Sequence, residues 1–214
     1  MTKSRLNLRK VVAIAICLAG FSVGNVLAQD NTTDQGVVIN GVKWATRNVD
    51  KPGTFAANPE AMGMFYQWNR KVGWSSTAQK LNSNGGTTWE TNIPIGDSWE
   101  KANDPSPVGW RVPTLNEINK LLDNSKVNKE WTTLNGINGW KFTDITTKNS
   151  IFLTAAGCRN KEGTLENVGV SGHFWSSTKN SSISAYGLGF SSYGAELGWN
   201  YGRRDGFSIR SVAE

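Results

Sequence analysis

The second half of this 214-residue chain consists of short apolar runs separated by clusters of glycine, asparagine and serine. Runs of this length, bounded by turn-forming residues, are typical of β-strands, and strands joined by such short connections pair as antiparallel hairpins. The sequence therefore predicts a domain in which strands predominate and helix is scarce. The predicted strands are residues 151–156, 174–177, 185–191 and 206–212.

A β-hairpin is also predicted close to the start of the domain. The pair Asn40-Gly41 lies between two apolar, alternating segments, residues 37–39 and 42–46. Both residues tolerate the positive φ that a type I′ turn requires, and this makes Asn-Gly the strongest short-range hairpin signal. We expect the two segments to pair across this turn.

One segment carries the start signal of a helix. Thr114 is placed as the N-cap, and Glu117 three residues later completes a capping box. Ile118, Leu121 and Leu122 supply one apolar face. We expect a helix over residues 115–123 that packs on a sheet.

Residues 50–107 show weak periodicity and many glycine, asparagine, serine and proline residues. So long an irregular stretch is unusual in a compact domain unless it is functional or packed by its own aromatic side chains. We expect a large loop region pinned by tryptophans, with one short helix or strand at residues 62–70. The tryptophans of this stretch are Trp68, Trp74, Trp89 and Trp99.

The first 28 residues resemble a cleavable signal peptide. Four basic residues without any acid come first, an apolar run over residues 11–23 follows, and residues 26–28 end in the small Ala28 that a signal peptidase accepts. A transmembrane helix fits less well, because the apolar run is shorter than the ~20 residues that a bilayer core requires. A lipoprotein signal at Cys17 also fits poorly, since Ile16 stands where a small residue is needed.

These signals predict a signal peptide at residues 1–28, a flexible lead-in at 29–36 and a single domain at 37–214, exported to a secreted, periplasmic or cell-surface location. Cleavage would lower the formal charge from +6 to +2, because 19 basic residues would remain against 17 acidic ones. The remaining Lys and Arg residues are scattered and form no run. We therefore expect no nucleic-acid partner and no membrane-spanning segment after cleavage.

Cysteine and histidine content excludes several kinds of site. Without Cys17, Cys158 stands alone, so no intramolecular disulfide can form. Cys158 is interpreted as a small residue at a strand end, because no adjacent base can be named that would activate its thiol. One Cys and one His cannot make a His/Cys zinc site. No metal and no cofactor are predicted, although a carboxylate calcium site stays open.

Five segments, in order along the chain, resemble the Fibrobacter succinogenes major paralogous domain, a family of secreted and surface proteins of Bacteroidetes and Fibrobacteres. The motif at residues 109–117 also resembles the formylglycine-generating enzymes. The resemblance implies an α+β fold of the C-type-lectin-like kind, with short antiparallel strands, one or two helices and a long loop region. The segments are residues 41–49, 109–117, 152–157, 172–178 and 204–212.

The same resemblance argues against catalysis. Formylglycine-generating enzymes hold copper with a pair of cysteines, whereas this chain offers only Cys158. His173 lacks the Gly-x-Ser-x-Gly elbow of a serine hydrolase and is interpreted as a structural histidine. The carboxylate pairs Glu60 with Asp97 and Glu100 with Asp104 are interpreted as solvated loop residues. We therefore expect a non-catalytic protein.

Tryptophan is the residue type with the strongest bearing on function. Trp44, Trp110 and Trp175 flank apolar segments and are expected in the core, whereas Trp74, Trp89, Trp99 and Trp199 lie among polar residues. Alternation along a hairpin would put Trp199, Tyr201 and Arg203 on one face. A strand face covered by the long loop is the alternative. The predicted ligand-binding patch is Trp199, Asn200, Tyr201, Arg203 and Arg204.

From these features we expect a secreted or surface binding module that recognises carbohydrate, because aromatic faces beside amides and guanidinium groups suit sugar rings. The alternative is a structural or adhesin-type subunit of the bacterial envelope that recognises envelope or host proteins.

Overall fold

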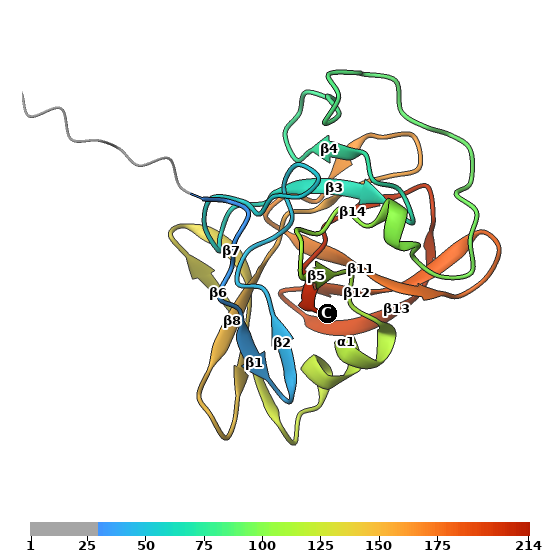
Figure 1. The fold of residues 1–214 in the computed structure, drawn as a ribbon. Helices are drawn as coiled ribbons and strands as arrows, with labels where there is room; N and C mark the ends of the chain where they lie inside the picture. The colour runs from blue at the N-terminus through green and yellow to red at the C-terminus, as the bar shows by residue number, and fades with distance from the viewer. Residues whose placement is uncertain (1–29) are drawn as a thin grey trace, which may run out of the picture.

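The computed structural model describes residues 30–214, apart from the side chains of residues 196–200. The predicted signal peptide lies outside the described residues. Residues 30–214 form four antiparallel sheets, with strand orders β1-β2-β15-β5, β10-β9-β14-β3-β4, β11-β12-β13 and β6-β7-β8. In Figure 1 the β6-β7-β8 sheet lies on the left beside β1 and β2, and the β11-β12-β13 sheet lies on the right above the helix α1.

The expected α+β, C-type-lectin-like fold is wrong. Strands account for 39% of the chain and helix for 6%, with a single α-helix among the described residues. The physical reason is that only residues 114–122 combine a cap with an apolar face at helical spacing, whereas turn residues interrupt the other apolar runs before a second helix could form. The fold is essentially all-β.

The helix α1 (Leu115–Leu122) confirms the helix prediction. Thr114 and Glu117 form the predicted capping box, and Ile118 and Leu121 are buried. The helix packs against strands of the β11-β12-β13 sheet.

Two Asn-Gly turns close hairpins. The β1-β2 hairpin confirms the prediction, with Asn40 and Gly41 both at positive φ. The longer hairpin β6-β7 was not predicted, although Asn135-Gly136 has the same positive-φ pair at its tip. Its strands carry Trp131 and Trp140 opposite each other, so the sequence signal was present.

The predicted strand at 206–212 is divided between two sheets. Its first part, β14, pairs with β3 and β9, whereas its last part, β15, pairs with β2 and β5. Between them Ile209 and Arg210 cross the interior of the molecule and are buried.

Besides α1, the elements are β1 (Val37–Ile39), β2 (Val42–Trp44), β3 (Met64–Gln67), β4 (Gly73–Ser75), the 3-10 helix η1 (Lys101–Asn103), β5 (Trp110–Arg111), β6 (Val127–Leu134), β7 (Ile137–Asp144), β8 (Ser150–Thr154), β9 (Cys158–Arg159), β10 (Leu165–Glu166), β11 (Ser171–Lys179), β12 (Ser184–Ser191), β13 (Gly194–Gly202), β14 (Gly206–Phe207) and β15 (Val212–Ala213).

The long stretch at 50–107 is only partly irregular, because it contains β3, β4 and η1. All four of its tryptophans are buried, as the pinned-loop prediction requires. The indole N–H of Trp68 donates to the Ser176 carbonyl, and that of Trp89 donates to the Lys161 carbonyl. These bonds tie the stretch to elements more than 70 residues away in the sequence.

Three buried arginines hold loops to strands. The guanidinium of Arg159 donates to carbonyls of residues 75–79 and to Gly163, and that of Arg210 donates to residues 45–48 and to Phe152. Arg203 makes the third such cluster. Each guanidinium has five N–H donors, so one side chain can satisfy several buried carbonyls that have no strand partner.

The predicted lead-in is anchored to the domain by Asp34. The Asp34 carboxylate accepts hydrogen bonds from the backbone and hydroxyl of Thr46 and pairs with Arg47 at 3.2 Å. This contact holds the segment before β1 against the end of β2. Among residues 30–214 there is no helix that is long and apolar enough to cross a membrane.

Candidate functional site

The alternation on which the predicted patch depends is interrupted in the backbone of β13. The pairing of β12 with β13 shifts by one residue between Gly187-Gly198 and Ala185-Tyr201, so β13 has one extra residue there. Such a bulge breaks the strict alternation of side chains along a strand. The backbone of Trp199 and Asn200 lies in this bulge, and their side chains are outside the described part of the chain.

Arg203 lies in the interior and does not share an open face with Tyr201. It is only 2% exposed, and its guanidinium donates to the carbonyls of Pro94, Gly96 and Ser181. The guanidinium carbon also lies 4.2 Å from the centre of the Trp68 ring. Arg204 is half-buried and donates one long bond, 3.4 Å, to the Thr91 carbonyl.

The loop tryptophans pack on each other and on the core. Trp74 and Trp89 are buried with ring centres 4.8 Å apart, and Trp99 is buried against Trp68. None of these three therefore presents an open indole face to a ligand. They fix the position of the loops around the strands.

Tyr201, the remaining described member of the patch, lies beside a pocket of about 490 Å³ on the β11-β12-β13 sheet. We call it the His173 pocket. The strands β11, β12 and β13, the β12-β13 turn and the loop before β11 contribute to it. It is lined by Asn167, Ser171, His173, Gly189, Phe190, Ser191, Tyr193, Gly194, Ala195 and Tyr201.

Two glycines of β12 make room for the Tyr201 ring. A Cβ atom at Gly187 would lie 3.3 Å from that ring, and one at Gly189 would lie 2.1 Å from the Tyr201 hydroxyl oxygen. The ring is also wedged edge-on against Phe207, with centres 4.8 Å apart. The Tyr201 ring therefore lies over Gly187 and Gly189 of the neighbouring strand β12.

His173 borders the pocket from β11, edge-on to Tyr201 with ring centres 5.5 Å apart. Its Nε2 lies 3.1 Å from the Ser171 hydroxyl, whereas its buried Nδ1 has no hydrogen-bond partner among the described residues. Burial lowers the pKa of His173 to about 4. The ring is therefore neutral at physiological pH, with one nitrogen left unpaired.

The lining has the chemistry of a site for an uncharged ligand. Among the side chains that the structure describes, no Lys, Arg, Asp or Glu lines the His173 pocket. Two tyrosines and Phe190 offer apolar surface, and Asn167, Ser171 and Ser191 offer hydrogen-bonding groups. Tyr193, at the tip of the turn, is 98% exposed.

Acid sensitivity provides a test of the environment of His173. Between about pH 6.5 and pH 4 the unfolded chain binds a proton at His173 and the folded chain does not. The free energy of unfolding therefore has its full value above pH 6.5 and decreases as the pH falls toward 4. Replacing His173 with Gln should remove this loss. When the pH is lowered from 7 to 4.5, the free energy of unfolding of the parent should fall by about 2 kcal/mol more than that of the variant, as measured by urea denaturation.

The other titrating groups are common to both proteins, including Asp205, whose pKa burial raises to about 6. The difference between the two unfolding curves therefore isolates His173. A difference that does not vary with pH would show that His173 is solvated in the folded protein.

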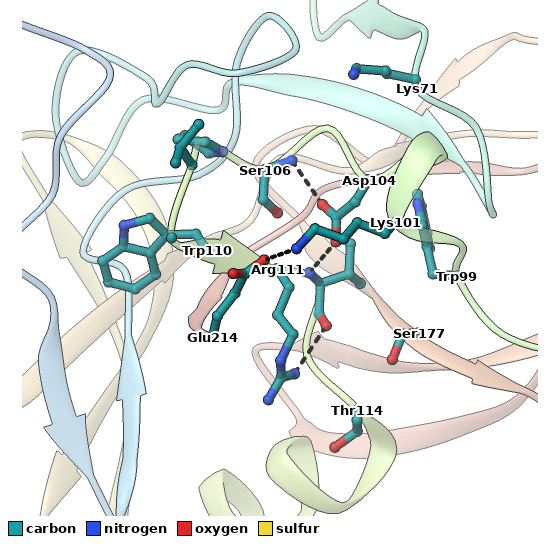
Figure 2. A pocket seen from close by; sticks show the side chains of 14 residues that line it. Lys71, Trp99, Lys101, Asp104, Ser106, Trp110, Arg111, Thr114, Ser177 and Glu214 are labelled. Carbon is teal, nitrogen blue, oxygen red and sulfur yellow. Dashed lines mark hydrogen bonds and ion pairs between the residues drawn. The ribbon is translucent and has the colours of Figure 1, made fainter.

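A second hollow, of about 440 Å³, surrounds the motif at residues 109–114 (Figure 2). We call it the Trp110 cleft. Trp110 lies on one side and Trp99 on the other, with Asp104 and Lys101 between them. The Lys101 amine lies 3.3 Å from the Glu214 carboxylate. Unlike the His173 pocket, this cleft is lined by charges of both signs.

Arg111 connects the Trp110 cleft to the helix cap. It forms a two-pronged ion pair with Glu117, with N–O distances of 2.7 and 2.9 Å. Although burial raises the pKa of Glu117, hydrogen bonds from Arg111 and Thr114 hold it below its ordinary value. The Asp104 carboxylate accepts the backbone N–H groups of Ser106 and Val112 and thereby shapes the loop.

The other residues considered for catalysis have separate surroundings. Cys158 starts β9 and is buried, and burial raises the pKa of its thiol to about 12, so the thiol stays protonated. Glu60 accepts a hydrogen bond from Asn135, whereas Asp97 pairs with Lys179. Glu60 and Asp97 therefore have different partners and do not act on each other as a carboxylate pair.

Comparison with known proteins covers part of the chain. Residues 124–212 match the model of a domain family of unknown function, DUF8237. The matched stretch is less than half of the chain; it contains every residue that lines the His173 pocket but not the motif at residues 109–114. No curated protein and no solved structure matches the chain.

Proposed function

We propose that this protein is an exported, non-catalytic binding module that recognises a neutral carbohydrate in the His173 pocket. The observation that carries the proposal is the lining of that pocket: two tyrosines, uncharged polar side chains and a neutral His173. A sugar ring has apolar C–H faces and hydroxyls that both donate and accept.

The pocket suits such a ring in size as well as in chemistry. Its volume of about 490 Å³ falls within the range of small-molecule sites, ~300–1,000 Å³. The exposed Tyr193 ring can stack on C–H groups, and the side chains of Asn167, Ser171 and Ser191 can form hydrogen bonds with sugar hydroxyls. Because no cation lines the pocket in the described part of the chain, an acidic sugar would leave its carboxylate without a partner there.

The second candidate function, a protein-interaction subunit, is supported by a different surface. Ile93, Ile95 and Ile183 are exposed, and Arg203 holds their two loops together through the carbonyls of Pro94 and Ser181. Aliphatic side chains on rigid neighbouring loops suit a protein partner. The variant Ile95→Asp tests this second function. The function is favoured if the variant no longer co-purifies with envelope proteins but still binds glycan.

Binding of neutral glycans tests the first proposal. Purified residues 29–214 should bind neutral glycans in preference to acidic ones on an array, and calorimetry with the best neutral glycan should give a measurable affinity. Gly189→Ala should lower that affinity at least about tenfold, because the new methyl group displaces the Tyr201 hydroxyl. Tyr193→Ala should also weaken binding, through loss of the exposed aromatic ring.

Ser192→Ala is the matched control, since Ser192 is exposed on the same turn but does not line the pocket. It should bind as the parent does. Near-ultraviolet circular dichroism checks that Gly189→Ala is folded, and Tyr193→Ala removes an exposed side chain that the core does not need. Absence of any neutral glycan hit, or unchanged affinity in both variants, would refute the proposed site.

A further inference from the structure

The Trp110 cleft contains a guanidinium with a free hydrogen-bonding edge. The two terminal nitrogens of Arg111 donate to Glu117, and Nη1 also reaches the Val112 carbonyl at 3.4 Å. Within residues 30–214 its Nε–H has no partner. Since a guanidinium has five N–H groups, the edge formed by Nε and one hydrogen of Nη2 is available. The side chain is 37% exposed and lines the cleft.

A free guanidinium edge is complementary to a carboxylate. The two parallel N–H groups match the two oxygens of a carboxylate, and such pairs are stronger than bonds between neutral groups. Two more cations, Lys71 and Lys101, line the same cleft. Lys101 is 89% exposed and pairs only at the surface with Glu214, an interaction weak enough to rearrange around a ligand.

The cleft does not suit a bare anion, because Asp104 and Glu214 also line it. Their carboxylates would repel a simple acid, but they accept hydrogen bonds from hydroxyl groups. Each oxygen of Asp104 accepts one backbone N–H and has a further lone pair. The ligand that satisfies both sets of groups carries one carboxylate and several hydroxyls.

We propose that the Trp110 cleft binds a sugar acid of the hexuronic type, with its carboxylate on the free edge of Arg111 and its hydroxyls on Asp104 and the neighbouring serines. The cleft volume of about 440 Å³ accommodates one such ring, and the half-buried Trp110 lines it with apolar surface for the C–H groups (Figure 2). This second site is independent of the His173 pocket and stands whether or not that pocket binds neutral glycans.

Three probes distinguish this proposal from simple alternatives: methyl glucuronide, methyl glucoside and acetate. Calorimetry at low ionic strength should give at least about tenfold tighter binding of methyl glucuronide than of either other probe. The Trp110 indole N–H resonance should shift during the glucuronide titration. Equal affinity for glucuronide and glucoside, equal affinity for glucuronide and acetate, or no binding of glucuronide at millimolar concentration would overturn the proposal.

Arg111→Lys is the decisive variant, because it keeps the positive charge and removes the two-pronged edge. Affinity for methyl glucuronide should fall at least about tenfold. Lys101→Met, at an exposed side chain that the fold does not need, should lower the affinity a few-fold and weaken its dependence on salt. Ser192→Ala, at an exposed side chain that lines neither pocket, should leave glucuronide binding unchanged. If both cleft variants bind glucuronide as the parent does, the site is not this cleft.

Discussion

Replacing Arg210 with Met is expected to lower the free energy of unfolding by about 4 kcal/mol, a large part of the total stability of a domain of this size. Arg210 is 1% exposed, and its five hydrogen bonds satisfy the Asn48 side-chain oxygen and the carbonyls of Ala45, Thr46 and Phe152. Methionine fills a similar volume but donates nothing, so these acceptors would lose their partners while still buried.

Urea denaturation followed by tryptophan fluorescence measures this effect. Lys71→Met, which removes an exposed cation, is the control and should change stability by no more than ~0.5 kcal/mol. Burial lowers the pKa of Arg210 to about 9, which reflects the cost of keeping this charge away from water. If Arg210→Met loses less than about 1 kcal/mol, packing of the methionine offsets the lost hydrogen bonds, and the arginine is dispensable for the fold.

Arg203→Met is expected to lower the free energy of unfolding by about 3 kcal/mol and to loosen residues 91–97. The Arg203 guanidinium donates to Pro94, Gly96, Ser181 and Ser184, and these bonds join that loop to the β11-β12 turn. Loss of the clamp should speed amide hydrogen exchange in residues 91–97, measured by mass spectrometry, while the β6-β7 hairpin keeps its protection.

Arg204→Met is the matched control, because Arg204 is the neighbouring arginine and makes a single long bond at the surface. It should leave both stability and exchange close to the parent values. This pair of variants also decides between two roles for Arg203. If Arg203→Met keeps full stability and loses only glycan binding, Arg203 contacts a ligand, as the sequence pattern predicted, and the buried clamp is not its role.

Local signals in the sequence predicted local structure well. The capping box at Thr114 and Glu117 and the Asn40-Gly41 turn depend on neighbours a few residues away, so the residues themselves define them. The same rule could have found the β6-β7 hairpin from Asn135-Gly136. The resemblance to a known family led to the wrong fold class, because the matching motifs do not by themselves fix how many helices a chain forms.

The His173 pocket could not be predicted because its residues meet only after three strands have paired. The His173 pocket requires β11, β12 and β13 to pair in one register, and the Tyr201 ring fits only because glycine occupies positions 187 and 189 on the neighbouring strand. His173 was interpreted as structural, and no local pattern marks its unpaired nitrogen. Likewise, the alternation of apolar and polar residues in the sequence gives no sign of the extra residue in β13.

By itself the sequence determined the turns, the single capped helix and the strand-rich character of the chain, since these depend on backbone preferences of adjacent residues. The tertiary structure alone decided which polar and aromatic groups are buried. Arginine is normally a surface residue, yet Arg159, Arg203 and Arg210 are inside because loops without strand partners bring carbonyls around them. Burial depends on what the rest of the chain places nearby, and sequence neighbours do not encode it.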